Sequence, residues 1–266
     1  MNIKTLGAAF ALSAVLTNTA HAHDTWLLPT QFEVAPNQNV TIGLTSGMAF
    51  PELETGPKRE RVRAAECRLA ERTFAIKDIS EGPHSLRLVT EAAEAGVATF
   101  WVEFPPKEIE LKPEQVQEYL EEIGAPAALL KEWAEMKPPR WRESYSKHQK
   151  TFVRVGTPPV ADHSWSKPVG IALEIVPDQD PTAVRAGGEF AVHVLKNGKP
   201  FPDFPLNAIA GGETKGETQE TDAAGRVTFR LGKAGRWLLR GTDVRKSTRA
   251  EADWDSDFTT LTLEVR

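Results

Sequence analysis

Residues 189–200 have the sequence EFAVHVLKNGKP, which shows the pattern of a β-hairpin most clearly. Apolar and polar side chains alternate along its first half, which places Ala191 and His193 on one face of an extended strand. Asn197-Gly198 separates this run from the next, and that dipeptide favours the tight turn of a β-hairpin. The stretch therefore predicts two antiparallel strands joined by a two-residue turn.

Similar short apolar runs lie on both sides of this hairpin. Turn residues separate them, as at residues 222–225. Short strands at such regular spacing are typical of a β-sandwich of about 100 residues. We therefore predict an Ig-like β-sandwich over residues 169–266, whose further strand candidates are GIALEIVP (170–177), TDAAGRVTFRL (221–231), RWLLRG (236–241) and FTTLTLEV (258–265).

Residues 23–158 show the same strand pattern with one interruption. TFWVEF at 99–104 is rich in β-branched and aromatic residues, as expected of a strand. Near residues 113–137 the apolar side chains instead recur at helical spacing, and Gly124 divides this insert into two short helices. The strand pattern returns at 150–155, and a proline-rich linker follows. The fold class predicted for the whole chain is therefore all-β, with two Ig-like β-sandwich domains in tandem and a small helical insert.

Residues 1–22 have the layout of a secretory signal peptide. Lys4 precedes the apolar run LGAAFALSAVL, and Ala20-His21-Ala22 places small residues where signal peptidase cuts. The apolar run is too short to span a bilayer, which needs about 20 residues, and no later segment approaches that length. We therefore expect cleavage before His23, a periplasmic or secreted protein, and no membrane span after signal removal.

The composition excludes several other classes of protein. The 266 residues include 32 Lys and Arg against 37 Asp and Glu, for a net charge of −5, and no basic patch suggests nucleic acid as a partner. Cys67 is the only cysteine, so an intrachain disulfide is impossible, and we expect a buried small hydrophobe. The chain lacks a nucleophile elbow, a phosphate loop and a dinucleotide fingerprint, so no motif argues for an enzyme.

His23 is the residue that carries the most chemistry. Cleavage before it would leave a free α-amine, which could chelate one metal ion together with the ring Nδ1. The amine has an ordinary pKa of about 7.7–8.0, so a metal ion can displace its proton near neutral pH. Nitrogen donors suit copper, nickel and zinc. The alternative is a chance histidine at a disordered end, but the apolar residues from Trp26 onward favour a terminus held in the fold.

A third metal ligand would have to come from elsewhere in the fold. His148 is the first choice, because its segment is polar and lies beside the helical insert, and Asp24 and Asp257 are the fallbacks. Met48 offers a thioether, which suits reduced copper, although most methionines fill cores. Asp257 also belongs to the acidic cluster at 253–257, for which we expect a solvated strand edge.

A set of segments in a fixed order gives the chain a family resemblance. The segments are AHDTWLLP, GMAFP, LKPEQVQEYLEEIG, RESYSKHQKTFVRVG, GIALEIVPDQDP, TDAAGRVTF, GRWLLRGTDVR and ADWDSDFTTLTLEV. Together they resemble an exported bacterial family of domains of unknown function, whose members are often described as periplasmic nickel/cobalt-uptake components. The resemblance covers essentially the whole chain after the signal. It implies a pair of Ig-like sandwiches, a transition-metal ion such as nickel or cobalt, and a membrane metal-uptake transporter as a possible partner.

The resemblance also places individual residues. The AHD start matches His23 and Asp24 to the family's most recognisable feature, whereas the chain departs from the family at Met48, where histidine is often found. The resemblance implies no catalytic residue.

Two functions remain open from the sequence. The first is a metal-binding protein associated with the uptake or handling of nickel, cobalt or copper. The second is a structural or adhesion-like β-sandwich module without a metal, and a copper-dependent oxidative enzyme built on the terminal histidine is a distant third. The metal content of the mature protein separates the first from the second, and turnover that depends on an oxidant identifies the third.

Overall fold

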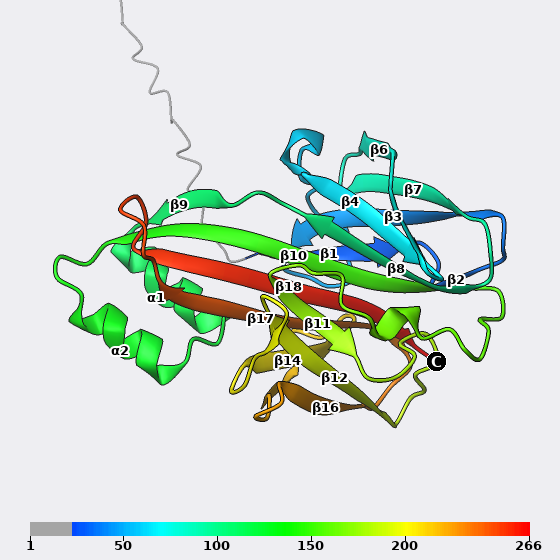
Figure 1. Ribbon diagram of the computed structural model, residues 1–266. Helices are drawn as coiled ribbons and strands as arrows, with labels where there is room; N and C mark the ends of the chain where they lie inside the picture. The colour runs from blue at the N-terminus through cyan, green and yellow to red at the C-terminus, as the bar shows by residue number, and fades with distance from the viewer. Residues whose placement is uncertain (1–22) are drawn as a thin grey trace, which may run out of the picture.

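A computed structural model describes residues 23–266, so the predicted signal peptide lies outside the described residues. The organising element is a long twisted sheet, whose two longest strands run nearly the length of the molecule (Figure 1). Among the described residues this sheet has ten strands. In spatial order they are β15 (Glu217–Glu220), β14 (Pro205–Ala210), β17 (Gly235–Lys246), β18 (Trp254–Val265), β10 (Trp141–Val155), β8 (Gly96–Glu103), β4 (Ala64–Leu69) and β5 (Arg72–Ala75), and β2 (Glu33–Val34) and β9 (Lys107–Leu111) also pair with β10.

The two central strands of this sheet pair in parallel, in register from Glu143 opposite Trp254 to Thr151 opposite Thr262. Short β2 also pairs with β10 in parallel, whereas β8, β9 and β17 pair antiparallel with these two strands. A parallel pair between segments more than a hundred residues apart cannot form through a hairpin, so the last strand of the chain closes the fold against its middle.

Two smaller sheets cover opposite faces of the central sheet. One contains β1 (Asp24–Pro29), β3 (Gln38–Gly47), β7 (Leu86–Ala92) and β6 (Asp78–Glu81). The other contains β11 (Leu173–Pro177), β12 (Gly188–Lys196), β13 (Lys199–Pro200) and β16 (Arg226–Leu231). The hairpin predicted at Asn197-Gly198 is present, because Lys196 pairs with Lys199 and both turn residues have positive φ.

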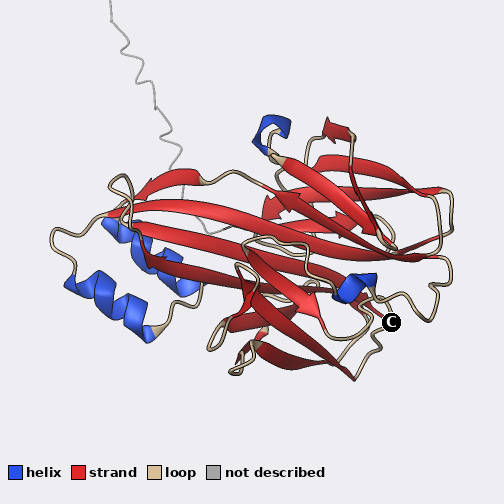
Figure 2. Cartoon of the chain, in the orientation of Figure 1, coloured by secondary structure: helices blue, strands red, loops and turns tan. Residues whose placement is uncertain are grey.

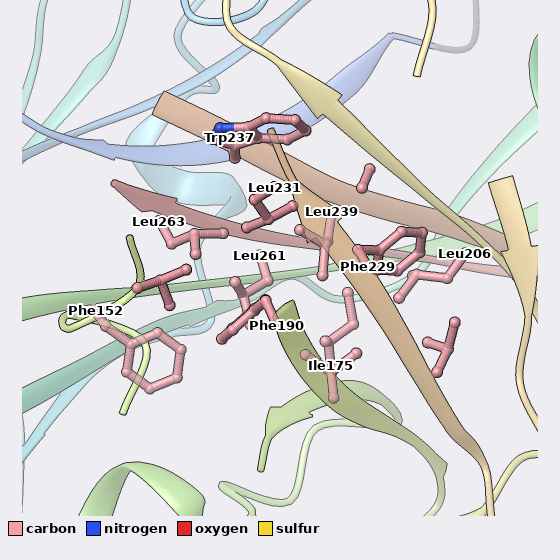
Figure 3. Close-up of a cluster of buried hydrophobic side chains, with 14 of the residues drawn as sticks. Phe152, Ile175, Phe190, Leu206, Phe229, Leu231, Trp237, Leu239, Leu261 and Leu263 are labelled. Carbon is pink, nitrogen blue, oxygen red and sulfur yellow. The ribbon is translucent and has the colours of Figure 1, made fainter. Parts of the chain in front are cut away.

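Each small sheet packs against the central sheet around its own apolar core. The first core contains Leu27, Ile42 and Val153, and the second contains Phe152 with residues such as Phe190 and Phe229. Figure 3 shows Phe152 of β10 beside these later residues. Because side chains alternate along a strand, β10 presents Val153 to the first core and Phe152 to the second. The two β-sandwiches therefore share one sheet.

The helical insert covers one end of the central sheet. It consists of α1 (Pro113–Glu122) and α2 (Ala127–Glu135), which Figure 2 shows as the two helices at that end. Trp141 of β10 lies at the centre of their contact, stacked on Trp254 with ring centroids 4.6 Å apart. The Tyr119 hydroxyl of α1 donates a hydrogen bond to the buried Glu143 carboxylate of β10 at 2.8 Å. This polar contact adds to the apolar packing between the helix and the sheet. Two short 3₁₀ turns, Arg59–Arg61 and Ser164–Ser166, complete the regular structure of the described residues.

A buried ion pair joins the shared sheet to the second sandwich. The Lys150 ammonium on β10 donates to the Glu174 carboxylate on β11, and each side chain is only 1% exposed. The two Glu174 oxygens also accept the backbone N–H groups of Val169 and Gly170, at 2.8 and 2.9 Å. The pair therefore anchors the segment that leads into the second sandwich.

The predicted all-β fold with two β-sandwiches and a small helical insert is confirmed. The strand expected at 150–155 begins earlier, at Trp141, because its polar side chains find buried partners and its backbone pairs with β9 and β18. Cys67 is buried in the first core as expected, and burial raises the pKa of its thiol. Between residues 23 and 266, no helix has the length and apolar character needed to cross a membrane.

Candidate metal-binding site at the start of the first strand

The backbone of His23 is held against the centre of the shared sheet. Lys147 of β10 donates from Nζ to the His23 carbonyl at 2.6 Å and to the Thr25 hydroxyl at 3.0 Å. The strand β1 begins one residue later, and Thr260 of β18 donates to the Thr25 carbonyl at 2.6 Å. Residue 23 is therefore part of the folded body, as the apolar residues after it led us to expect.

Lys147 is a cation that the fold removes from water. Burial lowers its pKa to about 8, although the carboxylates of Asp24 and Glu143 act to raise it. Its ammonium lies within 6 Å of the rings of Tyr145 and Phe258, at 5.8 and 5.5 Å from their centroids. No pattern in the sequence predicts this contact, because Lys147 is one of several charges in a polar run.

The loop after β3 lies beside the same end of β1. The β1–β3 ladder ends with Asp24 opposite Gly47, and the hydroxyls of Thr25 and Ser46 are 2.7 Å apart. Met48 is the first residue after β3, and it is 56% exposed. Met48 is therefore not a core residue, unlike most methionines.

A cleft of about 480 Å³ opens beside these strand ends. Asp24 and Met48 contribute to one wall, and the end of α1 contributes Glu121 and Glu122. The remaining wall comes from β14, the loop before β15, β17 and Phe258. Acidic side chains, a thioether and the start of the first strand thus gather around one hollow.

Asp24 already has a charged partner at this cleft. Its carboxylate accepts a hydrogen bond from Arg240 of β17, which also contacts the Asn207 side chain at 3.4 Å. This ion pair joins β1 to the second half of the shared sheet. As a metal ligand, Asp24 would have to exchange or share that partner.

His148 and Asp257 form a separate buried pair. The imidazole Nε2 lies 2.9 Å from Asp257 Oδ1, and Arg245 donates to Oδ2 at 2.8 Å. The two residues are only 7% and 6% exposed, so the expectation of a solvated edge is wrong for Asp257. Burial acts to raise the pKa of Asp257, but the contacts with His148, Arg245 and Lys196 outweigh it and hold that pKa below its ordinary value.

The alternation of β10 separates this pair from His23. Lys147 points toward β1, where it binds the His23 carbonyl, whereas Lys150 and Phe152 point toward the second sandwich. His148 precedes Lys150 by two residues and Phe152 by four, so its ring projects from the same face of the sheet as their side chains. The structure therefore brings His148 to Asp257 and Asp24 to the neighbourhood of His23, but it places the two groups on opposite faces of the sheet.

Carboxylates, imidazoles and thiols alone do not form a metal cluster in the described part of the chain. Within residues 23–266, no group of three or more His, Cys, Asp and Glu side chains is arranged to hold a metal ion. A terminal chelate uses different donors, because an α-amine and a thioether are not among these side chains.

The chain has distant likenesses to solved structures. The D0–D1 region of intimin is 14% identical over 90% of this chain and 96% of its own, with a TM-score of 0.22. The adhesin InvE of Yersinia pseudotuberculosis is 14% identical over 91% of this chain and 58% of its own, with a TM-score of 0.24. Murine CEACAM1b is 8% identical over 92% and 98%, with a TM-score of 0.21. Similarity at this level does not indicate what the chain binds.

No curated protein matches the chain. A family model does match it, over residues 20–242, which include the strand that begins beside His23, the Met48 loop and the helical insert. The chain therefore belongs to the family described as Domain of unknown function (DUF4198).

Proposed function

We propose that this is an exported periplasmic protein that binds one transition-metal ion, copper, nickel or cobalt, and serves its uptake or handling. The observation that carries the proposal is the anchoring of His23. Its carbonyl is bound by Lys147, and the next residues form β1, so the predicted mature terminus is a fixed part of the structure.

The proposed chelate consists of the His23 α-amine and the ring Nδ1. Both nitrogens belong to one residue whose backbone is already ordered, so binding loses less conformational entropy than it would for ligands on mobile loops. The amine exists only after cleavage before His23, and the proposal therefore requires the predicted signal peptide to be removed there. Two nitrogen donors favour copper or nickel and leave coordination positions for further ligands.

The surroundings of His23 can complete such a site from one side only. Asp24 and Met48 lie at the cleft beside it, whereas the His148–Asp257 pair projects from the other face of the sheet. Asp24 is the nearest carboxylate in the chain sequence, and its bond to Arg240 orients it. We therefore assign the metal to the cleft side of β1.

The role in uptake follows from the family resemblance, which implies a membrane metal-uptake transporter as the partner that receives or delivers the ion. The competing function is a β-sandwich interaction module that binds no metal. Metal binding by the correctly processed protein separates the two.

The test is calorimetric titration of protein that its own host has exported and cleaved. Copper(II), nickel(II) and cobalt(II) are titrated into three samples: the form that begins at His23, a form with one extra N-terminal residue, and a His163→Ala control. His163 is exposed and lies beside the Ser164–Ser166 turn, which contacts β8 and β11. We expect one equivalent of copper or nickel to bind to the native and control forms, and the extended form to lose at least about tenfold in affinity.

Equal affinity of the native and extended forms would exclude the amine chelate. Failure of all three metals to bind to the native form would favour the metal-free interaction module.

A further inference from the structure

Met48 is an apolar side chain in an unusual place. It is 56% exposed, although methionine generally fills gaps in cores. Its side chain lines the cleft together with Asp24, the first residue of β1. Packing therefore does not explain why a thioether stands at this position.

The backbone on both sides of Met48 is firmly held. One oxygen of Glu54 accepts the N–H groups of Met48 and Ala49, both at 2.7 Å. A Cβ added at Gly47 would meet that oxygen at 2.2 Å, so glycine is the residue that allows this close approach. Two residues later, Phe50 is buried against Trp26 of β1, with ring centroids 5.7 Å apart. The loop thus presents Met48 at a fixed position and leaves its sulfur at the surface.

The strand register places Met48 beside the proposed chelate. The antiparallel ladder ends with Asp24 opposite Gly47, so His23 and Met48 are the next residues of the two chain segments as they leave it. Thr25 and Ser46 form the preceding pair of the ladder, and the hydrogen bond between their hydroxyls stabilises this register. Two soft or borderline donors from different strands therefore emerge at the same end of β1.

We infer that Met48 supplies its thioether sulfur as a third ligand to the ion held by His23, and that it makes the site selective for copper(I). This inference rests on the proposed function. Thioether sulfur is a soft donor that favours copper(I), whereas nickel(II) and copper(II) gain less from it than from nitrogen. Met48 therefore determines which metal and which oxidation state the terminal chelate retains.

The experiment compares two methionine variants that both keep the native His23 terminus. Met48→Leu removes the sulfur at the cleft, and Met136→Leu removes one that packs against the helical insert. Copper(I) affinity is measured without oxygen, by competition with a chromophoric copper(I) chelator, and nickel(II) affinity is measured by calorimetry. Circular dichroism verifies that each variant is folded.

We expect Met48→Leu to lower copper(I) affinity by about tenfold or more and to leave nickel(II) affinity within about twofold of the unaltered protein. Met136→Leu should change neither. X-ray absorption at the copper edge should show a sulfur neighbour that disappears in Met48→Leu.

Copper(I) affinity that is unchanged in Met48→Leu would overturn the inference while nickel(II) binding at His23 still supports the proposed function. An equal loss in both methionine variants would overturn it as well. If the unaltered protein binds neither ion, the proposed function itself fails.

Discussion

Replacement of Lys150 by methionine should destabilise the protein more than any exposed charge deletion. Lys150 and Glu174 are each 1% exposed, and methionine fills a similar volume without the ammonium. Glu174 would keep its two backbone N–H donors, from Val169 and Gly170, but would lose the ammonium of Lys150 and remain buried. Removing one partner of a buried ion pair costs about 3–5 kcal/mol, because the remaining charge is uncompensated.

This magnitude translates into a large thermal shift. In a chain of this size, 1 kcal/mol moves the midpoint by about 2–4 °C, so Lys150→Met should lower it by roughly 6–20 °C. The matched control is Lys167→Met, which removes the cation of an exposed pair with Glu71, and such pairs contribute about 0–1 kcal/mol. The double variant Lys150→Met/Glu174→Gln should recover part of the loss, because it leaves no buried charge.

The assay is urea and thermal unfolding of the four proteins, followed by circular dichroism. The free energy of unfolding of Lys150→Met should lie well below that of Lys167→Met, with the double variant between them. If Lys150→Met loses no more than the exposed control, or if the double variant is less stable than Lys150→Met, the reasoning about an uncompensated Glu174 charge is refuted.

Four further outcomes follow from the site and the helical insert. Burial raises the pKa of Glu143 against the lowering effect of its hydrogen bonds, so the folded chain retains a proton that the unfolded chain releases. The free energy of unfolding should therefore fall as the pH rises from the ordinary carboxyl range through this raised pKa. Glu143→Gln should flatten this pH dependence of the urea midpoint, and equal slopes for the variant and the unaltered protein would contradict the prediction. Tyr119→Phe removes a buried donor to Glu143 and should cost about 1–3 kcal/mol, with faster proteolysis at the helical insert; unchanged cleavage would show that apolar packing alone holds the helices. Gly47→Ala should displace the Glu54 carboxylate, release the Met48 loop and weaken copper(I) binding while nickel(II) binding persists, and a simultaneous loss of both would point to β1 instead. His148→Ala should leave metal affinity unchanged, because the ring faces away from His23, and a tenfold loss in calorimetry would place it in the site after all.

The elements whose pattern is local could be predicted from the sequence. The Asn197-Gly198 turn has the positive φ values that this dipeptide tolerates, so its hairpin follows from neighbouring residues. The insert was predictable because Val116, Tyr119 and Leu120 recur at helical spacing, and all three are buried. His23 was identifiable as a candidate ligand because an imidazole and a new amine occur in one residue, a property that needs no tertiary contact.

The way in which distant segments meet depends on tertiary packing and could not be predicted from local patterns. The polar run of β10 was not predicted as a strand before residue 150, because Lys147 and His148 look solvated until their partners are known. Those partners come from β1 and from β18, and the pairing depends on packing between sheets, which no local pattern encodes. The same long-range pairing sets adjacent residues on opposite faces, so that Lys147 holds the backbone of His23 while His148 is directed to Asp257. The neighbourhood of Met48 likewise depends on the register of β1 against β3, where a slip by one residue would turn every side chain to the other face.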